Sequence, residues 1–88
     1  MNAAQQFSQA EQCFADGQLK EAANLCKEIL DTHPEFARGY YLMGALFNKT
    51  GNFESAVKFA DLAIKYGPAN PDFYVQKGYS LLCLKRYE

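Results

Sequence analysis

An interval of 34 residues recurs along this 88-residue chain and constrains its fold more than any other feature of the sequence. Prolines stand at positions 34 and 68, and glycines stand at positions 17 and 51. Further pairs share the interval: Ala10 with Gly44, Gly44 with Gly78, Tyr40 with Tyr74, Ala22 with Ala56, Leu30 with Ile64, Leu19 with Phe53, and Phe53 with Tyr87. Self-similarity at one period predicts a stack of structural repeats, each packed only against its neighbours.

The stretch 37–70 carries the pattern most completely. It reads Tyr40-x-x-Met43-Gly44-x-x-Phe47, then Ala56, and then Pro68. This resembles the tetratricopeptide repeat, whose pattern is Trp-x-x-Leu-Gly-x-x-Tyr, then Ala and Pro, in two antiparallel helices. The resemblance covers nearly the whole chain. It implies an all-α fold, a right-handed superhelical stack of antiparallel helix pairs (an α-solenoid) with about five helices.

The repeat divides the chain into about two and a half units within a single domain, 1–88. Repeat 1 spans about 3–36, repeat 2 spans 37–70, and partial repeat 3 spans 71–88. Apolar periodicity and turn residues predict helices over 3–16, 19–31, 37–50, 53–66 and 71–84. Asn52 and Asn70 can cap the helices that follow them, because their side-chain oxygens accept from free N–H groups. Gly67 is expected to stop the fourth helix.

Small residues are expected where helices approach closely. A glycine inside a helix costs about 1 kcal/mol against alanine, so Gly44 and Gly78 are expected to serve packing. The predicted contact pairs within the hairpins are Ala10 with Ala22, and Gly44 with Ala56. The first repeat is less regular and is interpreted as an N-terminal cap, or else as a polar contact surface. Ile29 stands where Ala63 stands in repeat 2, which predicts a different spacing between repeats 1 and 2.

Composition excludes several classes of function. A net charge of -1 gives no case for binding nucleic acid or a membrane surface, and no apolar run is long enough to span a membrane. The N-terminus has no secretory pattern, and the three cysteines are an odd number without metal-type spacing. Reduced thiols and a cytoplasmic location are therefore expected.

The sequence predicts no catalytic site, no metal site and no cofactor. His33 is the one histidine and is expected in an exposed turn, and no Gly-rich phosphate loop is present. Resemblance places Cys13 and Cys26 on facing sides of the first hairpin, as two buried apolar residues or as a redox pair. Cys83 is expected to be exposed. Asp61 and Lys65 are expected to form a solvated pair within one helix.

The resemblance implies a concave groove lined by the first helix of each repeat. The groove positions are Phe7 and Glu11 in repeat 1; Arg38, Tyr41, Ala45, Asn48 and Lys49 in repeat 2; and Asp72, Val75, Gln76 and Tyr79 in repeat 3. Aromatic side chains beside polar groups suit the capture of a peptide or helix. Two interpretations of Tyr41 and Tyr79 stay open: half-buried packing residues, or residues that contact a partner.

Some members of this family hold the C-terminal carboxylate of chaperone tails with Lys, Asn and Arg. The corresponding positions here are Phe7, Glu11, Leu42, Asp72 and Gln76. Glu11 and Asp72 would repel a carboxylate, and Phe7 and Leu42 cannot donate to it. The sequence therefore argues against this kind of partner.

The helix of partial repeat 3 carries apolar residues that no later helix covers. They are Tyr74, Val75, Tyr79, Leu81, Leu82 and Leu84. Two expectations follow: the native polypeptide continues past Glu88, or the chain self-associates through helix 71–84. The resemblance predicts a non-enzymatic scaffold that binds a protein or peptide in its groove, as part of a longer chain. The alternatives are a docking or regulatory region of a larger enzyme, and a self-assembly module.

Overall fold

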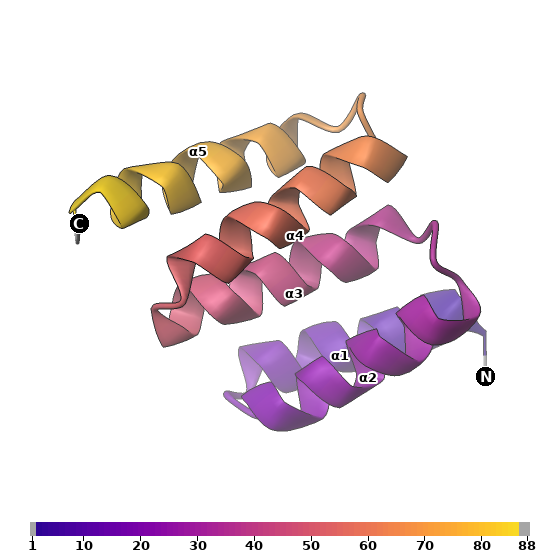
Figure 1. The fold of residues 1–88 in the computed structure, drawn as a ribbon. Coiled ribbons are helices and arrows are strands. Elements are labelled where there is room, and N and C mark those ends of the chain that lie inside the picture. Colours follow the sequence, from indigo (N-terminus) through magenta and orange to yellow (C-terminus); the bar gives the residue numbers. More distant parts are fainter. Residues whose placement is uncertain (1, 87–88) are drawn as a thin grey trace.

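The computed structural model describes residues 2–86 and shows two helical hairpins followed by a fifth helix. The helices are α1 (Ala3–Ala15), α2 (Leu19–Thr32), α3 (Ala37–Thr50), α4 (Phe53–Tyr66) and α5 (Pro71–Arg86). Figure 1 shows them stacked in chain order, with α5 at one edge and the α1–α2 hairpin at the other. The all-α architecture of stacked helix pairs that the resemblance implied is confirmed. The helix α5 runs through Arg86, beyond the predicted end near 84, and residues 87 and 88 lie outside the described residues.

Two glycines turn the chain within the hairpins. Gly17 and Gly51 have φ of 83° and 84°, the left-handed region that a side chain makes costly. After each glycine, a backbone N–H reaches back to close the preceding helix. The Gln18 N–H donates to the Cys13 carbonyl at 2.8 Å, and the Asn52 N–H donates to the Phe47 carbonyl at 2.8 Å. These hydrogen bonds satisfy carbonyls that the end of each helix leaves without an intrahelical donor.

Asparagines start three of the helices. The Asn52 side chain accepts from the Ser55 N–H at 3.4 Å, and the Asn70 side chain accepts from the Asp72 N–H at 3.0 Å. Both caps were predicted from the sequence. Asn2 adds a reciprocal cap with Gln5 at the start of α1, which the sequence analysis did not include. Gly67 follows the last residue of α4, as predicted, and its lack of a side chain also has a reason in packing. Its φ is -142°, and an added Cβ would lie 2.7 Å from the Phe73 ring.

The connections between repeats are held by the same hydrogen bond in both places. The Tyr40 hydroxyl donates to the Pro34 carbonyl at 2.6 Å, and the Tyr74 hydroxyl donates to the Pro68 carbonyl at 2.9 Å. Donor and acceptor are six residues apart in each case, so each bond ties a loop to the helix that follows it. This explains in physical terms why tyrosine and proline recur together at the 34-residue interval.

The core between the helices is built from small residues. Ala10, Ala22, Ala56, Ala60 and Ala63 are fully buried. Aromatic rings fill the remaining space of repeat 2, where Phe59 stacks on Phe47 with ring centroids 5.3 Å apart. Ile29 is also fully buried, in a cluster with Phe7 and Leu42 that joins repeats 1 and 2.

We predict that Tyr40→Phe lowers the free energy of unfolding by about 1 kcal/mol near pH 7, because it removes the hydroxyl that donates to Pro34. Burial, then Tyr66 and then Glu35 raise the pKa of Tyr40 above its ordinary value of 10.0. The folded state therefore holds this proton more tightly, so the stabilisation is present below pH 10 and is lost as pH rises through the folded pKa. Urea unfolding of both proteins from pH 7 to 11 measures the difference.

The wild-type protein should lose stability above pH 10 more steeply than Tyr40→Phe. Tyr74→Phe serves as the matched control, because it removes the same kind of hydrogen bond at the other junction between repeats. Parallel pH profiles for wild type and Tyr40→Phe would contradict the role given to Tyr40.

Candidate functional site

The first helices of the three repeats, α1, α3 and α5, border two adjoining hollows. One, of about 320 Å³, is lined by Tyr41, Ala45, Asn48, Asp72, Val75, Gln76 and Tyr79. The other, of about 200 Å³, is lined by Phe7, Glu11, Arg38, Tyr41, Asn70, Asp72 and Phe73. Tyr41 and Asp72 belong to both linings, so the two hollows adjoin at these side chains. We define the groove as the union of these two linings.

Ten of the eleven predicted groove residues lie in these linings, and Lys49 does not. The Lys49 ammonium instead lies 5.2 Å from the centroid of the Phe14 ring, a cation–π contact between α3 and α1. Alignment of the repeats did not predict this cation–π contact, because only repeat 1 has an aromatic ring at the position of Phe14. Lys49 was predicted to line the groove, and its ammonium lies over Phe14, outside the linings of both hollows.

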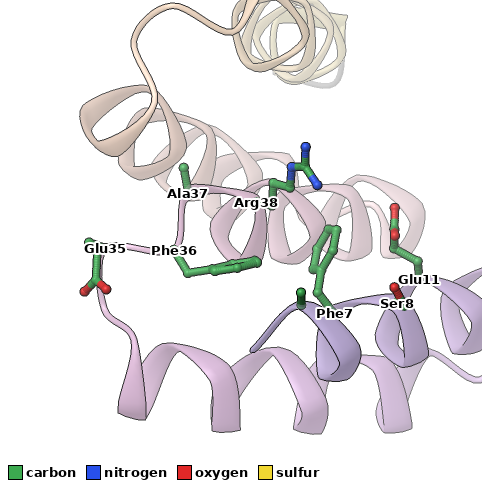
Figure 2. Close-up of a pocket in the computed structure, with 8 residues that line it drawn as sticks. Phe7, Ser8, Glu11, Glu35, Phe36, Ala37 and Arg38 are labelled. Atoms are coloured by element: carbon green, nitrogen blue, oxygen red, sulfur yellow. The ribbon is translucent and has the colours of Figure 1, made fainter. Parts of the chain in front are cut away.

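A third hollow extends the groove at the start of α3. Its volume is about 430 Å³, and its lining comprises Ala4, Phe7, Ser8, Glu11, Glu35, Phe36, Ala37 and Arg38. Figure 2 shows the Phe7 and Phe36 rings turned toward each other, with Arg38 and Glu11 beside Phe7. The two ring centroids are 5.5 Å apart. Sequence analysis missed Phe36, and it also missed Asn70, the residue 34 positions later that lines the neighbouring hollow.

Tyr41 is held in place at the centre of the groove. Its ring packs on Phe73 with centroids 5.3 Å apart, and its main-chain carbonyl accepts from Gln76 Nε2 at 2.7 Å. Tyr41 is half-buried, whereas Tyr79 is 55% exposed. Tyr41 thus has a packing role, and the face of Tyr79 that lines the groove remains accessible.

Gln76 joins α5 to α3 rather than projecting into the groove as a free polar group. It is only 7% exposed, and its amide lies over Gly44. A Cβ on Gly44 would lie 2.7 Å from Gln76 Oε1, so the missing side chain makes room for this amide. The three atoms nearest to such a Cβ all belong to Gln76, so Gly44 makes room for α5. Gln76 Oε1 is buried without a hydrogen-bond donor among the described residues.

A second polar contact lies beside the first. The fully buried Ser80 hydroxyl donates to Asn48 Oδ1 at 2.8 Å and also lies 3.0 Å from the Gln76 carbonyl. Two of the predicted groove residues, Gln76 and Asn48, therefore use their side chains to hold α5 on α3. This fixes the distance between the two helices that form the groove walls.

The groove has charges of both signs at one end. Glu11, Arg38 and Asp72 are all exposed and line the same hollow. Over residues 2–85, the one ion pair joins Lys77 to Asp61 at 2.7 Å, between α5 and α4. The predicted pair of Asp61 with Lys65 is therefore wrong; the Lys65 ammonium lies 5.3 Å from the Tyr66 ring centroid.

Chemical reactivity is not evident in the described part of the chain. Residues 2–86 contain no group of three or more metal-ligating side chains and no helix long and apolar enough to cross a membrane. Burial raises the pKa of Cys26 to about 12, so its thiol stays protonated and unreactive at neutral pH. Cys83, predicted to be exposed, is buried in α5 at 8% exposure. His33 is exposed, as predicted.

A stack of helical hairpins in which the first helix of each repeat lines one groove is typical of helical-repeat proteins. The family model described as tetratricopeptide repeat matches residues 13–77. The chain belongs to the tetratricopeptide repeat family, whose members are typically modules for protein interaction.

A curated relative is Protein SGT1 homolog from Oryza sativa subsp. japonica. It is 30% identical over 81 residues, which cover 92% of this chain and 22% of that protein. The chain thus spans about a fifth of the length of this relative.

We predict opposite effects from two equivalent substitutions in α3 and α5. Gly44→Ala displaces the Gln76 amide and breaks its bond to Tyr41, which outweighs the gain in helix propensity and lowers stability by about 1 kcal/mol. Gly78→Ala meets no atom within 4 Å and raises stability by about 1 kcal/mol. Urea unfolding of both variants at one low protein concentration measures the difference. Equal effects would contradict the contact between Gln76 and Gly44.

Proposed function

We propose that the chain is a non-catalytic scaffold that binds a peptide or a helix of another protein in the groove of α1, α3 and α5. The observation that carries this proposal is the pair of adjoining hollows, whose linings place Tyr41, Val75 and Tyr79 together with Arg38 and Asp72. Such a mixture of apolar area and polar tips is favourable for holding a peptide. The helices beneath it are tied together by Gln76 and Asn48, so a partner would meet a preformed surface.

The charges at the end of the groove indicate the partner's chemistry. Arg38 lines two of the hollows, one together with Glu11 and Glu35 and the other together with Glu11 and Asp72, so carboxylates outnumber guanidinium groups three to one along them. A neutral or basic peptide fits this balance better than an acidic one. The same reasoning argues against the carboxylate of a chaperone tail, because Leu42 is buried and Gln76 is already used by Tyr41.

A docking role within a larger protein is a second candidate. It is favoured by the match to Protein SGT1 homolog, of which this chain covers only 22%. Under that proposal the groove binds a segment of the same polypeptide or a substrate of its other domains. The cytoplasm suits either candidate, since three free thiols indicate a reducing compartment.

Selection from a displayed library of random peptides tests the groove directly. We expect peptides whose affinity falls at least tenfold, about 1.4 kcal/mol, in Arg38→Glu or in Val75→Asp. Both positions are exposed, so these variants should keep the helical content of the wild type by circular dichroism. The matched control is Lys58→Glu, the same reversal of charge at an exposed position of α4 that lines none of the three groove hollows.

Selected peptides that bind the groove variants and the Lys58→Glu control with equal affinity would contradict groove binding. Calorimetric titration of each peptide gives the affinities for all three variants.

The charge argument has its own test. One selected peptide is synthesised with a free C-terminal carboxylate and with a C-terminal amide, and both are titrated. We expect the carboxylate form to bind no more tightly than the amide form, because Glu11 and Asp72 repel it. A carboxylate form that binds tenfold more tightly would show that the groove does act as a carboxylate clamp.

A further inference from the structure

The third hollow, at the start of α3, combines aromatic rings with charges of both signs. Phe7 and Phe36 are its large apolar side chains, with ring centroids 5.5 Å apart and planes inclined at 56°. Glu11, Glu35 and Arg38 line the same hollow and are exposed. Figure 2 shows Arg38 and Glu11 beside Phe7, and Glu35 beyond Phe36. A ligand in this space of about 430 Å³ therefore meets apolar rings, two carboxylates and one guanidinium.

This hollow lies between two repeats that are both part of the chain. Its lining comes from α1, from the connection between α2 and α3, and from the first turn of α3. The residues 34 positions after Phe7 and Glu11 are Tyr41 and Ala45, which line the groove hollow between α3 and α5. The same side of the first helix thus faces the groove in repeats 1 and 2. Further repeats at either end would lengthen the groove and leave this hollow open.

The charged groups of the hollow are not used by the fold. Within residues 2–85, no ion pair includes Glu11, Glu35 or Arg38. A carboxylate and a guanidinium that line one hollow without pairing are available to two different groups of a ligand. Two carboxylates and one guanidinium also leave one net negative charge in the lining. The hollow therefore favours a ligand with one net positive charge and with an acceptor close to that charge.

We propose that this hollow binds the free N-terminus of a partner peptide. The α-ammonium donates to the carboxylates of Glu11 and Glu35, and the first carbonyl accepts from Arg38. These two peptide groups are on the order of 3 Å apart, because they belong to the same residue. The first side chain is apolar and packs chiefly on Phe36, since Phe7 is only 6% exposed. This inference rests on the proposed function, because the rest of the peptide lies in the groove.

The linings also give the peptide a direction. Phe7, Glu11 and Arg38 belong both to this hollow and to the groove hollow that Asp72 lines. A peptide that begins in the third hollow therefore runs from α1 toward α5.

Arg38 distinguishes a peptide N-terminus from other cations. A lysine ammonium lies at the end of a four-carbon stem, so it would bring a second positive charge near Arg38 without placing an acceptor there. A free amino acid offers an acceptor, but its own carboxylate cancels its positive charge and leaves the charge of the hollow unbalanced. The N-terminal residue of a peptide has both the net positive charge and the neighbouring carbonyl. Charge complementarity therefore selects it.

Acetylation of selected peptides tests the proposal. Peptides selected from a library displayed with free N-termini are synthesised with a free and with an acetylated N-terminus, and both forms are titrated by calorimetry at about pH 6.5, where the α-ammonium is charged. We expect acetylation to weaken binding to the wild type at least tenfold. The two forms should bind equally to the double variant Glu11→Gln, Glu35→Gln. Glu54→Gln removes an exposed carboxylate of α4 that lines none of the three hollows, so this control should keep the tenfold difference.

The Arg38→Gln variant tests the site by the sign of its effect. It should weaken the free peptide at least tenfold, because the first carbonyl loses its donor. Tighter binding would overturn the proposal, since a lysine side chain in the hollow gains when a neighbouring cation is removed.

Free and acetylated forms of equal affinity for the wild type would also overturn the N-terminal site. In that case a loss of affinity in Val75→Asp would still support binding in the groove. Peptides that respond neither to Val75→Asp nor to the changes in the hollow would overturn both proposals. Circular dichroism of each variant checks that the helices are retained, as expected for substitutions at exposed positions.

Discussion

The close approach of α3 and α5 at Gly44 is the constraint on which the groove depends. Because Gly44 has no side chain, the Gln76 amide can lie against α3 and donate to the Tyr41 carbonyl. Ser80 and Asn48 add a second polar contact one turn further along. Buried polar contacts of this kind have strict geometry, so they set both the distance and the register of the two helices. Gln76 and Asn48 thus both line the groove and set the distance between its walls.

Much of this fold could be predicted from the sequence, because residues that recur at a fixed interval mark equivalent positions in successive helix pairs. The interval of 34 residues, the two turn glycines and the capping asparagines gave helix bounds that differ from the structure by at most about two residues. The groove could be predicted to the level of which helices line it. The contacts made by the ends of long side chains could not be predicted from the sequence. Lys49 reaches Phe14 and Asp61 pairs with Lys77, because rotamers and neighbouring helices decide where such tips lie.

The glycines also show what could not be predicted from the sequence. Gly44 and Gly78 are equivalent by sequence, and both were expected to serve close packing. In the structure one accommodates Gln76 and the other meets nothing. Gly67 was expected to stop the fourth helix, and in the structure it also provides space for the Phe73 ring. A sequence can indicate that a glycine matters, but only the neighbours in space reveal whether it relieves the backbone or makes room for another side chain.

The paired hydrogen bonds from Tyr40 to Pro34 and from Tyr74 to Pro68 have a consequence for how this architecture changes over evolution. Each bond fixes one junction between repeats and touches neither the other junction nor the groove lining. In a linear stack, the angle at each junction is set locally, and the curvature of the whole follows from adding these angles. A substitution of one tyrosine, or a change in its loop, therefore alters the angle at one junction between repeats and leaves the angles at the other junctions unchanged.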